Sequence, residues 1–153
     1  MLQYFRYLWQ STNQHGVHSP YVYNFLTKGL YATKFKYQSV NPKAYKIALA
    51  TIAYFNFKKV YCEDQQLTKL LLLHYPDMQL NNSSETYDCI FVSISDPNKF
   101  ASKMHNNSLL FHLNKIDNIT KLTANFKLVL HFYCCQIVSN RKEQKKQLFV
   151  LRY

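Results

Sequence analysis

The stretch from Lys58 to Leu73, KKVYCEDQQLTKLLLL, most constrains what this chain can fold into. Residues 60–62 form a short apolar run typical of a buried strand, and apolar residues then recur at helical spacing. A strand, a tight turn and a helix is how an open α/β sheet presents a nucleotide or cofactor site. That turn normally contains glycine, which lets backbone N–H groups approach a ligand at the helix N-terminus. Here it reads Glu63-Asp64-Gln65-Gln66, and its two carboxylates would repel a pyrophosphate.

Glycine is scarce throughout the chain, because only Gly16 and Gly29 occur among its 153 residues. A Walker loop or a GxGxxG fingerprint needs several glycines in one short frame, so both are excluded. The length predicts one domain over residues 1–153, with a helical arm over 1–56 and an α/β sheet over 57–153.

The rest of the chain alternates between strand-like and helix-like segments. Strands are predicted over 60–62, 87–94, 108–113, 127–138 and 147–153, with at best a short strand over 77–80. Helices are predicted over 2–10, from Pro20 to near Gly29, and over 42–55, 67–74, 97–104 and 116–126. The last two strands are joined by the charged turn 141–146, which predicts a mostly parallel sheet ending in an antiparallel hairpin.

Local signals mark where some helices begin and how they face. Ser19-Pro20 and Asn41-Pro42 each place a capping residue before a proline, which predicts a helix start. In the first helix, four apolar residues fall on one side and predict an amphipathic helix. These residues are Leu2, Phe5, Leu8 and Trp9.

The formal net charge of +11 is unevenly distributed. Residues 1–62 contain Arg6, seven lysines and no acid, so most of the charge lies there. This favours an anionic partner such as RNA, an acidic protein or a membrane surface, whereas solubility alone is the alternative. In one interpretation, tyrosines of the arm stack on the bases of a single-stranded RNA and its lysines bind the phosphates. In the other, the tyrosines are half-buried in the fold and the lysines are simply solvated. These residues are Tyr31, Lys34, Lys36, Tyr37, Lys43 and Lys46.

The cysteines and the hydropathy pattern indicate a reduced, cytoplasmic protein. Four cysteines occur without a CxxC pair, so buried free thiols are expected rather than bridges or zinc. They are Cys62, Cys89, Cys134 and Cys135. Neither a signal peptide nor an apolar run long enough to span a membrane is found. Ser93, His105 and His112 lack a carboxylate pair, so no metal site is expected.

Three stretches resemble a bacterial class I S-adenosylmethionine-dependent methyltransferase-like family. Residues 15–23, HGVHSPYVY, are similar to its RHGVHSPFVF opening, and residues 141–152, RKEQKKQLFVLR, to its closing RKEQ…HFVLR strand. Between them YDCIFV (87–92) resembles the family's YDLIFID strand. The resemblance implies a Rossmann-like sheet with an antiparallel C-terminal hairpin and an ancestral S-adenosylmethionine pocket.

The departures from the family fall on that pocket. The glycine-rich E-x-G-x-x-x-G turn is replaced by Cys62, Glu63 and Asp64, and the acid ending the YDLIFID strand is replaced by Ser93. The acid pair after the next strand falls near His112, and the chain is shortened between residues 73 and 87. We therefore expect a sheet reduced in strands, a vestigial pocket and no cofactor, with S-adenosylmethionine bound only if the fold is still active.

Two groups of residues have competing interpretations. Glu63 or Asp64 would bind a ribose or an amine, or Asp64 would simply cap the following helix. His15 and His18 are the candidates for acid/base work at the pocket mouth, or they hold the arm on the sheet by hydrogen bonds. The favoured hypothesis is a non-catalytic relative acting through protein or nucleic-acid contacts. The alternatives are an active methyltransferase with an altered pocket and a basic RNA-binding module.

Overall fold

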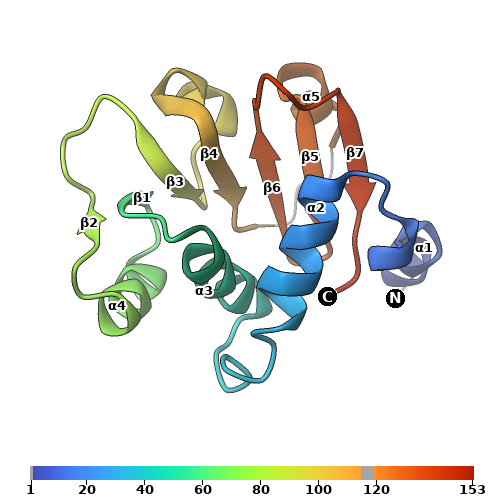
Figure 1. The fold of residues 1–153 in the computed structure, drawn as a ribbon, viewed down its shortest axis with the longest axis horizontal. Coiled ribbons are helices and arrows are strands. Elements are labelled where there is room, and N and C mark those ends of the chain that lie inside the picture. Colours follow the sequence, from blue (N-terminus) through green and yellow to red (C-terminus); the bar gives the residue numbers. More distant parts are fainter. Residues whose placement is uncertain (1, 115–118) are drawn as a thin grey trace.

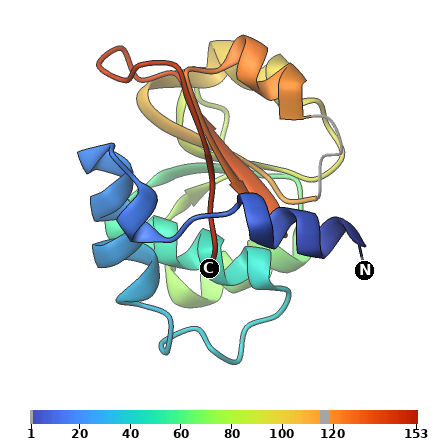
Figure 2. The ribbon, with the colours of Figure 1, turned by 90° about the vertical axis from the view of Figure 1, so that its right-hand side faces the viewer.

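In the computed structural model, which describes residues 2–114 and 119–153, helices cover both faces of a seven-stranded sheet (Figures 1 and 2). Its strands are β1 (Lys59–Cys62), β2 (Gln79–Leu80), β3 (Tyr87–Val92), β4 (Met104–His112), β5 (Leu128–Phe132), β6 (Cys135–Ser139) and β7 (Gln147–Val150). The spatial order is β2-β1-β3-β4-β6-β5-β7, and β6 runs antiparallel to both of its neighbours. The other neighbouring strands are parallel, so the predicted α/β class with a mostly parallel sheet is confirmed.

The helices form a layer on each side of the sheet, as Figure 2 shows. One layer contains α2, η2, α3 and α4, and the other contains η3 and α5. The helices are α1 (Leu2–Gln10), η1 (Gln14–Gly16), α2 (Pro20–Asn24), η2 (Phe25–Tyr31), α3 (Lys43–Phe55), α4 (Gln65–His74), η3 (Pro97–Lys103) and α5 (Ile119–Asn125). The segment η2 is a π-helix that directly continues α2, and η1 and η3 are 3-10 helices.

The central strands are apolar on both faces because each face is covered by helices. In β5, Leu128, Leu130 and Phe132 enter the larger core under α2, α3 and α4. Val129 points the other way, into the smaller core beneath α5 and η3. This period of two along a strand explains why the strand sequences read as nearly continuous apolar runs.

Residues of the N-terminal segment are built into the same core as the sheet. Val22, Phe25 and Leu26 are fully or almost fully buried in the larger core. Between α1 and α2 the chain also pairs with the end of the last strand. The Thr12 amide donates to the Val150 oxygen at 2.8 Å, and the Arg152 amide donates to the Thr12 oxygen at 3.0 Å.

The C-terminal hairpin differs in place from the prediction. The stretch 127–138 is not one strand but two, β5 and β6, which form the antiparallel hairpin around Tyr133 and Cys134. The strand after the charged turn, β7, pairs with β5 in parallel rather than closing the hairpin. The sheet as a whole is therefore not reduced to few strands. Between α4 and β3, where the sequence predicted a shortened segment, the structure has only the two-residue strand β2.

Several element boundaries also differ from the prediction. Asn41 does not cap α3, because Pro42 is the residue before the helix and makes no side-chain cap. Strand β4 begins at Met104, four residues before the predicted start. Helix α5 agrees with the predicted helix over 119–125, whereas the predicted residues 116–118 lie outside the described part of the chain.

The predicted apolar face of α1 is wrong at Phe5 and Trp9, whereas Leu8 is half-buried as expected. Phe5 and Trp9 are 62% and 92% exposed. The side that meets the sheet carries Tyr4 and Tyr7, whose rings contact Tyr133 at centroid distances of 4.9 and 5.3 Å. The Tyr7 hydroxyl also donates to the Leu151 oxygen, which fixes the rotation of the helix.

Candidate functional site

The predicted pocket residues come together at the carboxyl edge of the sheet. Cys62 ends β1, Ser93 follows β3, and His112 ends β4. Because these strands are parallel and adjacent, their carboxyl ends lie side by side. Glu63 and Asp64 follow β1 at this same edge, where open α/β sheets bind their ligands.

Glu63 closes this edge from within. Its Oε2 atom accepts the backbone N–H groups of Ser93, Ile94 and Ser95 at 3.0, 3.3 and 3.3 Å. Burial, the largest single influence, raises the pKa of Glu63, but the hydrogen bonds from the Ser95 hydroxyl and these three amides together lower it. The backbone amides that follow β3 therefore already donate their hydrogen bonds to the Glu63 carboxylate.

Asp64 caps α4, as one of the two interpretations predicted. Its Oδ1 atom accepts the Leu67 amide at 2.9 Å, and its backbone is extended, as an N-cap requires. The buried Tyr45 is a second neighbour, because burial and then the Asp64 carboxylate raise the pKa of this tyrosine. The Asp64 side chain is therefore committed to the fold.

Asp64→Ala is expected to lower the free energy of unfolding by about 1 kcal/mol, because the cap of α4 is lost. Asp64→Asn keeps an oxygen that accepts the Leu67 amide, so it is the matched control and is expected to lose only a few tenths of a kcal/mol. Urea unfolding of the three proteins measures both effects. Equal losses in the two variants would contradict the capping role.

Asn81 supports the end of β1, a role that the sequence did not reveal. Its backbone is left-handed, with φ of 55°. Its side chain accepts the Cys62 amide at 2.7 Å and donates to the Cys62 oxygen at 3.0 Å, so it replaces a missing strand neighbour. Burial raises the pKa of the Cys62 thiol to about 11, which keeps this thiol protonated and unreactive near neutral pH.

His112 and Ser93 are joined through Asn114. The His112 Nδ1 atom lies 2.7 Å from the backbone oxygen of Asn114. The side-chain amide of Asn114 donates to the backbone oxygen of Ser93 at 2.5 Å. A carbonyl oxygen only accepts, so Nδ1 of His112 must carry the proton. In the neutral ring the Nε2 atom then carries the lone pair and is the basic nitrogen.

A polar row continues from His112 across the sheet. Gln136 of β6 lies opposite both His112 of β4 and His131 of β5. The Gln136 side chain is fully buried; its Nε2 atom lies 3.2 Å from His131 Nδ1, and its Oε1 atom has no partner among the described residues. The signal in the sequence is a glutamine and a histidine inside the otherwise apolar run 127–138, which the pattern predicts as one strand.

His15 and His18 lie away from these residues. Both side chains are exposed, on the segment between α1 and α2. The motif that contains them is tied to the turn before β7, at the amino edge of the sheet. There Gln144 donates to the Ser19 hydroxyl at 3.5 Å, and the Arg141 guanidinium lies 4.4 Å from the centre of the Tyr21 ring. The structure therefore joins the two terminal motifs to each other and not to His112.

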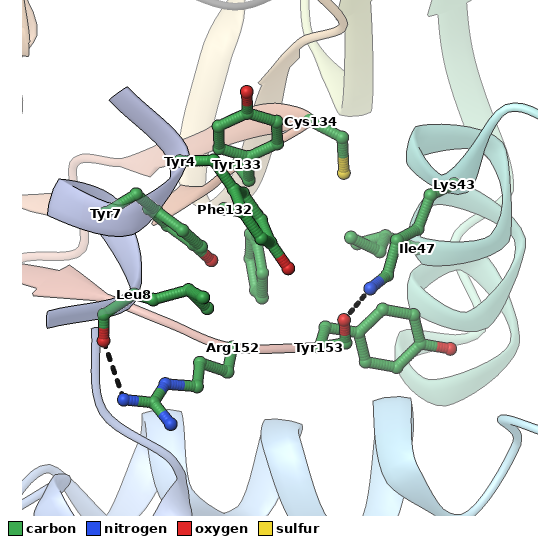
Figure 3. A pocket seen from close by; sticks show the side chains of 10 residues that line it. All are labelled: Tyr4, Tyr7, Leu8, Lys43, Ile47, Phe132, Tyr133, Cys134, Arg152 and Tyr153. Carbon is green, nitrogen blue, oxygen red and sulfur yellow. Dashed lines mark hydrogen bonds between the residues drawn. The ribbon is translucent and has the colours of Figure 1, made fainter. Parts of the chain in front are cut away.

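A hollow of about 400 Å³ opens further along the carboxyl edge, beside the hairpin turn (Figure 3). Aromatic rings from α1 and the hairpin face the start of α3 across it, with the residues after β7 between them. Its lining consists of Tyr4, Tyr7, Leu8, Lys43, Ile47, Phe132, Tyr133, Cys134, Arg152 and Tyr153. Sequence reasoning placed only Lys43 among the functional candidates here.

The hollow contains one thiol with an unusual environment. The contact between the Cys134 and Cys135 thiols lowers the pKa of Cys134, burial opposes this, and the Lys43 ammonium lowers the pKa further. The two sulfur atoms lie 4.0 Å apart, so they are not bonded. All four cysteines are free thiols, as the sequence predicted.

Comparisons with known proteins assign this chain to no family and give it no function. No protein-family model, curated protein or solved structure matches this chain. Within residues 2–114 and 119–153, no group of three or more His, Cys, Asp or Glu side chains is placed to hold a metal ion. Over the same residues, every helix is too short or too polar to cross a membrane.

Proposed function

We propose that this chain is a non-catalytic protein of methyltransferase-like architecture, which does not use S-adenosylmethionine and acts through contacts with nucleic acid or protein. The strand order supports the architecture, because a parallel run is finished by an antiparallel pair with β6 inserted between β4 and β5. The sequence resemblance implies a parallel run followed by an antiparallel hairpin, and here that hairpin is β5–β6 rather than the strands on either side of residues 141–146.

One observation carries the proposal, namely the Glu63 carboxylate bound to the amides of residues 93–95. An anion or a hydroxyl of a bound nucleoside would need such amides as donors. Here a charged acceptor of the chain already holds them. Any ligand would have to displace it and break its hydrogen bonds to these amides, at a cost of about 1–3 kcal/mol.

Titration with S-adenosylmethionine and S-adenosylhomocysteine tests the proposal. We expect no heat of binding and no shift in melting temperature at about 1 mM ligand, with an active methyltransferase in the same buffer as the positive control. A dissociation constant near about 10 μM would stabilise the fold by about 2.7 kcal/mol at that concentration and would reject the proposal.

A second candidate, methyl transfer by an altered pocket, is favoured by the row of His112, Gln136 and His131. His112 presents a basic Nε2 atom, and Gln136 presents a buried oxygen without a partner among the described residues. Transfer of a labelled methyl group to any acceptor, abolished in His112→Ala and retained in His105→Ala, would support this candidate over the first.

A further inference from the structure

We infer that the carboxyl edge carries a binding site for single-stranded nucleic acid, formed by the hollow beside the hairpin and a second hollow that adjoins it. The inference rests on the proposed function, and it deepens that function by naming one partner and its site. Bases would stack on exposed aromatic rings, and phosphates would bind lysine and arginine side chains between these rings.

The second hollow has a volume of about 370 Å³ and lies between the segment before α3 and the start of that helix. It shares Lys43 and Tyr153 with the first hollow, so the two hollows adjoin there. We call the combined surface the tyrosine–lysine groove. The second hollow is lined by Lys34, Phe35, Gln38, Asn41, Lys43, Lys46 and Tyr153.

Exposed aromatic rings lie at both ends of the groove. Tyr4 and Tyr133 are 45% and 38% exposed at one end, and Phe35 is 80% exposed at the other. Between them the Tyr153 ring stacks on Tyr31 with an interplanar angle of 12°. Exposed rings of this kind lose water at little cost when a base covers them, and stacking is tolerant of base identity.

Three cations of the groove, Lys43, Lys46 and Arg152, are held in place by hydrogen bonds. Lys46 donates to the Gln38 oxygen at 2.6 Å, and Lys43 donates to the Tyr153 oxygen. Arg152 donates to the Leu8 oxygen at 2.6 Å and to the Ser11 hydroxyl at 2.7 Å (Figure 3 shows its bond to Leu8). The acceptors of Lys46 and Arg152 are uncharged. Each cation keeps further N–H groups for a phosphate.

The charge of the lining has one sign. Among the residues that the structure describes, neither hollow has an acidic side chain in its lining, although four of the lining residues are cationic. These residues are Lys34, Lys43, Lys46 and Arg152. The absence of acidic neighbours in the lining strengthens the field at the groove and favours a polyanion.

The alternation of rings and cations favours a single strand over other polyanions. A duplex keeps its base faces stacked inside, where Tyr4, Tyr133 and Phe35 cannot reach them. An acidic protein would use the cations but would leave the rings without stacking partners. Unpaired bases use both features of the groove together.

Fluorescence anisotropy with a labelled oligouridine of about 12 nucleotides tests the inference, since each binding module covers about 4–16 nucleotides. Binding is expected to weaken with salt at a slope of about −0.7 for each phosphate bound. Lys34→Glu combined with Lys46→Glu is expected to weaken binding at least about tenfold and to reduce that slope by about 1 to 2. The matched control, Lys58→Glu combined with Lys59→Glu, makes the same charge change at the amino end of β1 and is expected to weaken binding much less.

Stacking is tested separately from charge. Tyr4→Leu combined with Tyr133→Leu keeps apolar bulk but removes the rings, and is expected to weaken oligouridine binding about 5- to 100-fold. Trp9→Leu, which removes a ring that is 92% exposed and does not line the groove, is the control and is expected to leave affinity unchanged. Melting temperatures establish that each variant is folded, and the lysine variants give an independent result if the tyrosine pair unfolds.

Bound oligouridine should also protect Cys134 from iodoacetamide, because this thiol lines the first hollow.

Three outcomes would overturn the inference. The first is no binding of oligouridine by about 100 μM at low salt, where electrostatic binding is strongest. The second is equal losses in the groove and control variants. The third is tight binding of polyglutamate with no effect of the tyrosine changes, which would identify an acidic protein as the partner. S-adenosylmethionine binding would reject the proposed function by itself and leave these readouts interpretable.

Discussion

Replacing Glu63 with alanine is expected to lower the free energy of unfolding by about 3 kcal/mol. The change removes one charged acceptor from the amides of Ser93, Ile94 and Ser95, and hydrogen bonds to charged groups contribute about 1.5–3 kcal/mol each without adding fully. The amides would be left to water at the end of β3. Urea unfolding at neutral pH measures the loss.

Glu63→Gln is the matched variant, because it keeps an oxygen acceptor of the same length but removes the charge. We expect it to lose about half as much stability as Glu63→Ala, because neutral hydrogen bonds are about half as strong as charged ones. Glu85 is an exposed carboxylate in the loop before β3, and Glu85→Ala is expected to change stability by less than about 0.5 kcal/mol. A loss below about 1 kcal/mol in Glu63→Ala would contradict the closing role assigned to this carboxylate.

Asp88→Ala is expected to destabilise the fold by about 3 kcal/mol from the opposite edge of the sheet. The Asp88 Oδ2 atom accepts the amides of Lys58 and Lys59, both at 2.8 Å, and its Oδ1 atom lies 3.0 Å from His105 Nε2. These contacts hold the start of β1 beside β3. The loss is the sum expected for two hydrogen bonds to a partly buried carboxylate.

The contribution of Asp88 is expected to depend on pH in a defined direction. Burial, the largest influence, raises its pKa, but the two amides and the hydrogen bond and charge of His105 outweigh burial and lower the pKa overall. A carboxyl group whose pKa is lower in the folded state stabilises the fold fully above its unfolded pKa, which is about 3.9. This stabilisation is lost as the pH falls through the lower, folded value.

Urea unfolding of wild type and Asp88→Asn as a function of pH isolates this effect from general acid denaturation. The stability difference is expected to be constant above about pH 5 and to shrink as the pH falls below about 4. His105→Ala removes only the half-exposed partner and is expected to cost less than about 1 kcal/mol. A difference that grows on acidification would contradict the assignment.

Periodicity and capping residues predicted many of the elements of this chain. The leucines of α4, the Asp64 cap and the Ser19 cap were all read from short stretches of sequence, and the structure has them. Such signals act within one or two turns of chain, so the sequence contains them without reference to the fold.

The hairpin was misplaced because its turn has no local signal. Tyr133 and Cys134 connect β5 to β6, and neither is a glycine, proline, asparagine or aspartate. Pairing of β7 with β5 then depends on contacts across about 20 residues of sequence. The rotation of α1 was missed for the same reason, since it is set by Tyr7 meeting Leu151.

The candidate sites likewise have features that the sequence predicted and features that depend on the tertiary structure. The sequence showed that no glycine directly follows β1 and that two carboxylates are present there. It did not reveal that Glu63 reaches the amides beyond β3, because this requires Cys62 and Phe91 to be aligned in adjacent strands. The sequence predicted only the lysines of the tyrosine–lysine groove, which lie within one segment of the chain. Its tyrosines come from three segments that are far apart in the sequence, so their proximity could not be predicted.

The sequence alone determined the α/β class, the scarcity of glycine at the expected cofactor turn and the concentration of positive charge before Glu63. Each of these depends on residue type and on spacing along a few residues. Only the tertiary structure decided which strands pair, where Glu63 binds, and that Tyr4, Lys43, Cys134 and Arg152 share one hollow. These features arise from contacts between residues far apart in the chain, and such contacts form only when the two faces of the sheet are buried together.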